Sequence, residues 1–304
     1  MPSDRKNILL AHLLLLAASI LWGCSYIFIK ELILCEPNMT TFVLVMLRLA
    51  VATLFAFPLL FFARKLERIA RRDVPLFLLI AFGEPFLYSI FETSGISRIT
   101  GSLASIITAT IPLFLPFGMA LVYHERIRWS TLAGIVVSFF GLAIMLFDGN
   151  MQLVVDPVGL LFLFGSVMVA VLYTLVLVKL VYRYEPVTIT VYQNLFALLY
   201  FIPLVLLFNR GSLTSLSYSP KMLALVAFLG LLCSTLAYVF FNRGVRHLGA
   251  TVSTVYTNLI PVSSLILAMM LGQESFEWVR IIGVAIVIVG LFVAQINSDK
   301  VSNN

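Results

Sequence analysis

The fold is decided by residues 108–142, TATIPLFLPFGMALVYHERIRWSTLAGIVVSFFGL, which recur in outline at 257–291 as TNLIPVSSLILAMMLGQESFEWVRIIGVAIVIVGL. Pro112 matches Pro261, an offset of 149 residues. The same offset relates other identical residues along the chain: Thr108 and Thr257, Glu125 and Glu274, Trp129 and Trp278, Gly134 and Gly283, Gly141 and Gly290, Lys30 and Lys179, Glu36-Pro37 and Glu185-Pro186. The chain is therefore a tandem duplication.

The composition indicates a chain that lies in hydrocarbon. Hydrophobic residues make up 61% and charged residues 11% of the 304 residues, and the mean hydropathy is +1.07, far more apolar than a soluble domain needs. Segments of about 20 apolar residues, the length of a membrane-spanning helix, occur at 8–29, 39–63, 75–96, 100–122, 129–147, 157–179, 187–208, 221–242, 249–271 and 279–296. The first resembles a signal peptide, but no A-x-A-like cleavage site follows it, so we interpret it as a retained helix.

Five spans in each half are an odd number, which turns the second copy upside down relative to the first. The predicted fold class is an all-α integral membrane protein of ten transmembrane helices in two inverted five-helix repeats, 8–148 and 157–296. Most of the 20 Lys and Arg residues fall in loops on the side of the N-terminus. The positive-inside rule then places both termini in the cytoplasm, and a bacterial inner membrane is the expected location. The basic residues are densest in one short loop: Arg64, Lys65, Arg68, Arg71 and Arg72.

The duplicated pattern resembles the EamA-type repeat of the drug/metabolite transporter superfamily over nearly the whole chain. The residues that carry the resemblance are Pro112, Glu125, Gly134 and Gly141 with their repeat mates, Trp22-Gly23 and Arg48. The resemblance implies ten helices around a central cavity lined mainly by helices 1–4 and 6–9, with helices 5 and 10 at the periphery. It also implies transport of small organic solutes. Similar members export amino acids or related metabolites, while others carry nucleotide sugars, phosphorylated sugars or cationic drugs, and this choice stays open.

The matched prolines lie near the middle of the fourth and ninth spans. A proline lacks an N–H, so the carbonyl four residues earlier, at Thr108 and at Thr257, loses its helical partner. Such carbonyls near mid-membrane are candidates for binding a polar solute, and Asn258 and Tyr256 add an amide and a phenolic hydroxyl nearby. The alternative is a structural kink whose carbonyl is satisfied by the threonine hydroxyl or by a neighbouring helix.

Three charged residues lie inside predicted spans of the first half. Glu84 and Glu92 occupy the third span and Arg48 the second. Charges at this depth are costly and usually face a cavity or each other. One interpretation makes a carboxylate a proton carrier or an amine ligand and makes Arg48 a ligand for a solute carboxylate. The other is a fixed Arg48–glutamate ion pair. We predict that at least one acid is left over, with Glu84 the first choice for proton coupling.

Aromatic and matched acidic residues complete the candidate set. Trp22 either lines the cavity or packs in the core. Three tyrosines are candidates for an aromatic wall: Tyr88, Tyr192 and Tyr238. Glu125 and Glu274 each precede a span, where an acid stabilises a helix N-terminus; gating is the alternative.

These observations favour a secondary transporter, most simply an exporter, of small polar solutes that works by alternating access. Multidrug efflux and exchange of sugar phosphates or nucleotide sugars are alternatives within the same class. An intramembrane enzyme is disfavoured because the sequence contains neither HExxH nor G-x-S-x-G. No cofactor, metal or nucleic-acid partner is expected. The expected partners are a small solute, the lipid bilayer and, as a candidate coupling ion, the proton; the expected state is a monomer or a weak homodimer.

Overall fold

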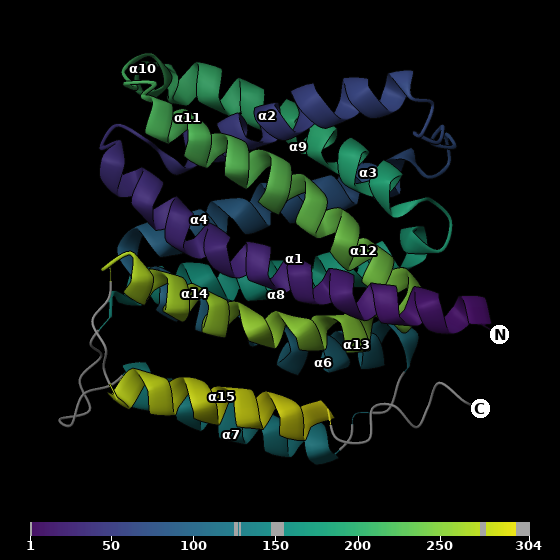
Figure 1. The fold of residues 1–304 in the computed structure, drawn as a ribbon, viewed down its shortest axis with the longest axis vertical. Helices are drawn as coiled ribbons and strands as arrows, with labels where there is room; N and C mark the ends of the chain where they lie inside the picture. Colours follow the sequence, from purple (N-terminus) through teal and green to yellow (C-terminus); the bar gives the residue numbers. More distant parts are fainter. Residues whose placement is uncertain (1, 125–126, 128, 147–154, 274–277, 296–304) are drawn as a thin grey trace.

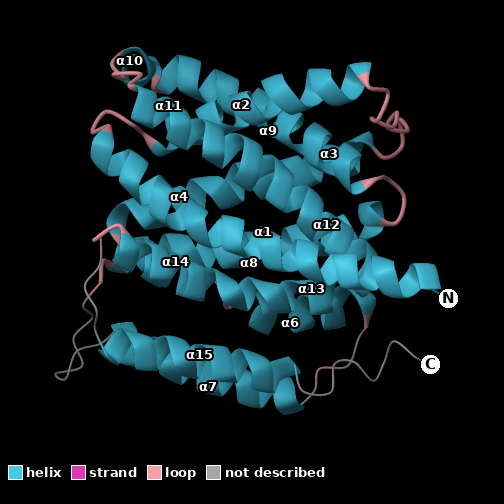
Figure 2. Cartoon of the chain, in the orientation of Figure 1, coloured by secondary structure: helices cyan, strands magenta, loops and turns pink. Residues whose placement is uncertain are grey.

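The computed structural model describes residues 2–124, 127, 129–146, 155–273 and 278–295. Within these ranges the regular structure is helical and no strand is present (Figure 2). Eight helical stretches are long and apolar enough to span a membrane, and two shorter apolar stretches lie at 132–142 and 281–290. The predicted all-α, ten-helix fold class is confirmed.

The first half places five spans in sequence order. They are α1 (Pro2–Cys35); α2 (Thr41–Phe62); a third span split into α3 (Val74–Ala81), the π-helical segment η1 (Phe82–Leu87) and α4 (Tyr88–Arg98); a fourth split into α5 (Gly101–Thr108) and α6 (Ile111–Tyr123); and α7 (Trp129–Leu146).

The second half repeats this order. Its elements are α8 (Pro157–Val181); α9 (Pro186–Phe208); the short α10 (Arg210–Thr214); an eighth span of α11 (Pro220–Ala227), the π-helical η2 (Phe228–Leu236) and α12 (Ala237–Leu248); a ninth of α13 (Ala250–Val255), the 3₁₀ segment η3 (Tyr256–Leu259) and α14 (Ile260–Met270); and α15 (Trp278–Gln295).

The inverted relation is visible where α7 and α15 pack as a pair at one side of the molecule (Figure 1). A Cβ added at Gly141 would lie 2.9 Å from the Gly283 carbonyl oxygen, and one added at Gly290 would lie 2.7 Å from the Gly134 carbonyl oxygen. The two contacts exchange places under the 149-residue offset. Glycine at positions 141 and 290 therefore lets two antiparallel helices approach closely, as small residues do in membrane interfaces.

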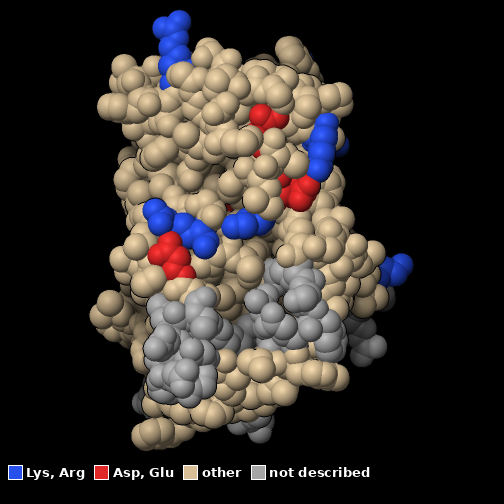
Figure 3. Space-filling view, turned by 90° about the vertical axis from the view of Figure 1, so that its left-hand side faces the viewer, with Lys and Arg blue, Asp and Glu red and all other residues tan. Residues whose placement is uncertain are grey.

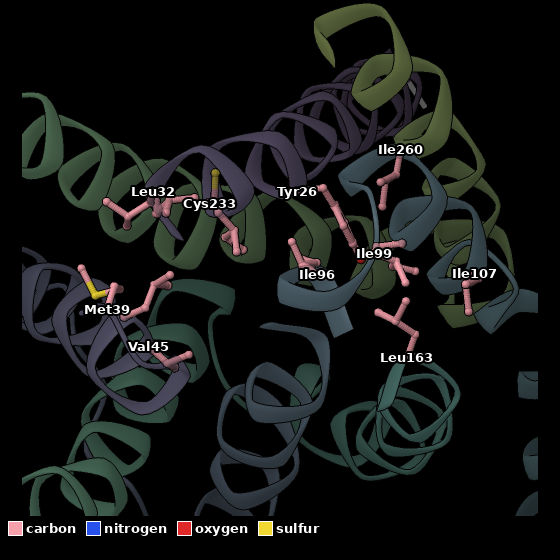
Figure 4. Close-up of a cluster of buried hydrophobic side chains, with 14 of the residues drawn as sticks. Tyr26, Leu32, Met39, Val45, Ile96, Ile99, Ile107, Leu163, Cys233 and Ile260 are labelled. Carbon is pink, nitrogen blue, oxygen red and sulfur yellow. The ribbon is translucent and has the colours of Figure 1, made fainter. Parts of the chain in front are cut away.

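The core lies among α1, α2, the third and fourth spans, and the second-half helices packed against them. Figure 4 shows part of this cluster, including Tyr26, Leu32, Val45 and Cys233, all of which are buried. Side chains at the two ends of the bundle tie the halves together. At one end Arg98 pairs with Asp156 at 2.9 Å, and at the other Arg183 pairs with Asp73 at 2.9 Å. This frame holds the central helices around a cavity.

Candidate functional site

A cavity lies between helices of both halves. It is bordered by α1, α2, η1, α4 and the break between α5 and α6 from the first half, and by α8, α12 and α13–α14 from the second. Of the nine predicted site residues, seven line it: Trp22, Arg48, Glu84, Tyr88, Glu92, Thr108 and Thr257. The intramembrane charges and the repeat-matched threonines thus meet in one place.

Glu84 lies where the third span leaves helical geometry. Its backbone is extended, with φ −127° and ψ 122°, and Pro85 follows it. A proline disfavours helical geometry in the residue before it, which explains the break at this position. The buried Glu84 carboxylate accepts a hydrogen bond from the hydroxyl of Tyr238 on α12. An acid of the first half is therefore held by a tyrosine of the second.

Glu92 heads a chain of hydroxyl groups. Tyr88 Oη donates to Glu92 Oε1 at 2.9 Å, and Tyr26 Oη lies 3.3 Å from Tyr88 Oη. Tyr26 Oη also donates to Thr108 Oγ1 at 2.7 Å, and Thr108 donates to the Ala104 carbonyl at 2.5 Å. The chain links α4 through α1 to the end of α5. A change in the protonation of Glu92 can reorder its donors and acceptors as far as the fourth span.

Arg48 is buried and is held from the opposite half. Its Nε donates to Ser234 Oγ at 2.8 Å, and Asn194 Nδ2 donates to the Ser234 carbonyl at 2.8 Å. Among the described residues, Arg48 Nη1 has no hydrogen-bond partner, and no carboxylate lies within 4.0 Å of the guanidinium. In this structure Arg48 therefore forms no contact ion pair with Glu84 or Glu92, although its charge acts on both carboxylates. A buried cation with a free N–H at a cavity wall can bind an anionic group.

The matched prolines interrupt their helices rather than kink them. A disturbance at mid-span was predicted, either a freed carbonyl or a kink, and in the structure α5 ends at Thr108 and Pro112 lies in the first turn of α6. In the second half the 3₁₀ segment η3 precedes Pro261 in the first turn of α14. Proline is well tolerated there because the first-turn N–H groups have no intrahelical partner. Broken helices at mid-depth are characteristic of transporter sites.

The threonine hydroxyls at these breaks bind local carbonyls. Thr108 Oγ1 donates to Ala104, and Thr257 Oγ1 donates to the Thr254 carbonyl at 2.6 Å. Their hydrogens are thereby used, so each hydroxyl is left to accept a hydrogen bond from a solute or, as at Thr108, from Tyr26.

Asn258 and Tyr256 do not line the cavity. Asn258 is buried beside it, and among the described residues its amide nitrogen and oxygen have no hydrogen-bond partner. The Tyr256 hydroxyl instead bonds to His12 Nδ1 on α1. Both flank the cavity-lining Thr257, and successive residues of a 3₁₀ segment point about 120° apart. Glu125 and Glu274 lie outside the described residues.

Of the three tyrosines considered for an aromatic wall, Tyr88 and Tyr238 line the cavity and Tyr192 does not. Other lining residues were not predicted: Tyr26, Tyr173 and the repeat-related hydroxyl pair Ser25 and Thr174. The 149-residue offset is the signal that could have found this pair. Trp22 lines the cavity and also donates its indole N–H to the Cys233 carbonyl at 3.3 Å, so it both packs and faces the cavity.

The charges of the cavity break the repeat symmetry. At the repeat mates of the three charged residues stand uncharged ones: Ala197 for Arg48, Cys233 for Glu84 and Phe241 for Glu92. The charge of the cavity therefore comes from the first half.

Comparisons with known proteins agree with this architecture. The model of the EamA-like transporter family matches residues 9–147 and 157–295. "Uncharacterized transporter YetK" of Bacillus subtilis (strain 168) is 30% identical over 297 residues, which cover 95% of this chain and 88% of the relative. An "Uncharacterized transporter" of Archaeoglobus fulgidus is 26% identical, with 92% of this chain and 96% of the relative covered.

Two further similarities are more distant. The "Probable terminal-alkyne amino-acid exporter" of Streptantibioticus cattleyicolor is 23% identical over 220 residues, 72% of each chain. A solved structure, "Crystal structure of protein", shares the fold with a TM-score of 0.66 at 16% identity, covering 91% of this chain and 98% of the other. The family match extends over both halves and agrees with the ten-helix architecture. The chain is an integral membrane protein and belongs to the EamA-like transporter family.

Proposed function

We propose that the chain is a secondary transporter that exports small zwitterionic solutes, such as amino acids or related metabolites. The observation that carries this proposal is the buried Arg48 guanidinium with an unbonded Nη1 in the same cavity as Glu84 and Glu92. Arg48 binds the solute carboxylate, and an acid binds the ammonium group. A solely cationic drug would leave the buried arginine without a partner, which is costly. The similarity to an amino-acid exporter supports the same class.

Alternating access follows from where the helices are broken. The extended residue Glu84 in η1, the break after Thr108 and the 3₁₀ segment η3 all border the cavity. These breaks absorb bending while the two halves rock around the central site. With both termini in the cytoplasm of a bacterial inner membrane, the cavity opens in turn to each side, and the protein transports rather than transforms its solute.

The test is thermal unfolding of the purified protein in detergent with each common amino acid added separately. A ligand that binds only the native state stabilises it by about 2.7 kcal/mol at a concentration 100 times its Kd. We expect at least one amino acid to raise the Tm by several degrees, whereas its amide and its N-acetyl derivative do not. Equal stabilisation by the amide would contradict a role for the carboxylate, and no response to any amino acid would contradict the solute class.

We further propose that Glu84 carries the coupling proton. A carboxylate in a low-dielectric cavity exchanges a proton when it becomes accessible from one side, and Glu84 alone among the two acids bonds a residue of the opposite half. In proteoliposomes the Glu84→Gln variant is expected to lose stimulation by an imposed pH gradient. The matched control is Glu185→Gln, an exposed acid at the end of the bundle. An intact gradient dependence in Glu84→Gln rules out proton carriage at this residue.

A further inference from the structure

The loop between α2 and α3 concentrates positive charge at the end of the molecule that holds the N-terminus (Figure 1). The basic loop, residues 64–72, contains Arg64, Lys65, Arg68, Arg71 and Arg72, all exposed. Among the described residues, the first four form no ion pair, and Arg72 has only a loose contact of 4.0 Å with Asp73. The cations of this loop are therefore available to a ligand from outside the chain.

Hydrogen bonds to the second half hold the backbone of the basic loop in place. The Glu67 N–H donates to Thr188 Oγ1 at 3.2 Å, and the Ala70 N–H donates to the Tyr184 hydroxyl at 3.1 Å. Tyr184 in turn donates to Asp73 at 2.7 Å. These bonds anchor the backbone of the loop to the start of α9. The positions from which the basic side chains extend are therefore fixed.

A surface hollow lies beside the basic loop. Its lining includes Arg72, Arg183, Tyr184 and the buried Asp73. The charge of Asp73 is already compensated, because Arg183 Nη1 lies 2.9 Å from one oxygen and Tyr184 bonds the other. The net charge around the hollow is positive, so it favours an anionic group.

Arg64 adopts a conformation that favours glycine. It follows the C-cap of α2 with φ 54°, in the left-handed region. Glycine is the usual residue at such a position, and a residue with a Cβ is disfavoured there. The chain nevertheless has an arginine at this place, which points to a use for its side chain.

The surface of α2 that leads to the loop is apolar. Phe55, Leu59 and Phe62 follow one another at helical spacing and are 63%, 70% and 81% exposed. In a membrane this stripe contacts acyl chains, and the basic loop begins directly beyond it. Apolar chains and an anionic group arranged end to end are the two parts of an anionic phospholipid.

The opposite end of the molecule differs. There Arg98 pairs with Asp156 and Lys221 with Glu31, so basic and acidic side chains lie next to each other (Figure 3).

We propose that the basic loop, together with Arg183, binds the headgroup of an anionic phospholipid whose acyl chains lie along the Phe55–Phe62 face of α2. Each cation near a lipid headgroup contributes about a five-fold gain in affinity.

The test is thermal unfolding of the full chain in neutral detergent with phosphatidylglycerol, phosphatidylcholine or inorganic phosphate added. Phosphatidylglycerol is expected to raise the Tm above the phosphatidylcholine value. This difference is expected to shrink as the salt rises from about 0.1 M to about 1 M, because screening shortens the Debye length from about 10 Å to about 3 Å. Equal shifts with the two lipids overturn the proposal, and a shift with inorganic phosphate equal to that with phosphatidylglycerol overturns its lipid part.

Two variants test whether the arginines of the basic loop bind the lipid headgroup. Arg64→Gly is expected to keep or raise the Tm without lipid, because glycine suits the left-handed conformation, yet to weaken phosphatidylglycerol binding about five-fold. The Arg64→Gly/Arg68→Gln/Arg71→Gln variant is expected to weaken it about a hundred-fold. Arg210→Gln, at the opposite end, is the control with wild-type binding. Wild-type affinity in the triple variant overturns the proposal.

Discussion

Replacing Arg48 with glutamine is expected to remove stabilisation by the zwitterionic solute and to lower transport 10- to 100-fold. Arg48 is 4% exposed and lines the cavity with Nη1 unbonded. A hydrogen bond to a charged group contributes about 1.5–3 kcal/mol, and about 1.4 kcal/mol corresponds to a factor of ten in affinity. The neutral amide of glutamine keeps much of the side-chain volume but loses the charge and the planar fork. Thermal shift and uptake into proteoliposomes measure the two effects separately.

The controls for this experiment separate charge from geometry. Arg243→Gln removes an exposed arginine on α12 and is expected to transport like the wild type. Arg48→Lys keeps the charge without the fork that binds a carboxylate through two N–H groups, so partial binding is expected. Wild-type affinity for the amino acid in Arg48→Gln would remove Arg48 from the site. The lipid site at the basic loop would be unaffected by that outcome.

The fold was predictable because its signal is repeated. A stretch of about 20 apolar residues strongly indicates a membrane-spanning helix. The 149-residue offset gives the same number of spans in each half. Inversion follows from the odd number of spans, and the close Gly141–Gly283 and Gly290–Gly134 contacts agree with it. The grouping of Arg48, Glu84 and Glu92 was predictable for a similar reason, since charges inside spans are few and costly.

The partners of these charges could not be predicted. Glu84 bonds Tyr238 and Glu92 bonds Tyr88, but the sequence marks these tyrosines only as candidates for an aromatic wall and does not indicate that they bond the two acids. Tyr238 meets Glu84 only because the two halves pack across the cavity. The same packing presents the Ser234 hydroxyl to Arg48 Nε, a partner in the opposite half that the sequence does not reveal.

The form of the helix breaks could not be predicted from the sequence either. Proline at mid-span indicates a disturbed helix but not its form. Because η3 is a 3₁₀ segment, the directions of its side chains depart from the 100° steps of an α-helix. Thr257 consequently lines the cavity while Asn258 and Tyr256 do not. The depth of a residue in the membrane was therefore easier to predict than the direction in which its side chain points.

The second large effect is expected for Gly230→Ala. Gly230 lies in η2, where a Cβ would be 2.5 Å from the Arg48 carbonyl oxygen and 3.1 Å from Val51 Cβ. Both neighbours belong to α2, and a backbone atom cannot rotate away, so α2 and η2 must separate. Overpacking of this kind costs about 1–3 kcal/mol. The separation also moves Arg48 relative to Ser234, one turn along η2, so transport is expected to fall at least about ten-fold with a lowered Tm.

The matched control is Gly83→Ala, beside Glu84 in η1. A Cβ there meets nothing closer than Tyr173 Cβ at 3.6 Å, which is an ordinary contact. Because alanine loses less conformational entropy on folding than glycine, this variant is expected to keep or slightly raise the Tm. Thermal unfolding and amino-acid uptake measured on both variants decide the point. If Gly230→Ala behaves like Gly83→Ala, the close contact between α2 and η2 does not hold Arg48 in place. A defect confined to Gly230→Ala instead ties the position of Arg48 to the packing of one half against the other, which is the contact that must change when the halves rock.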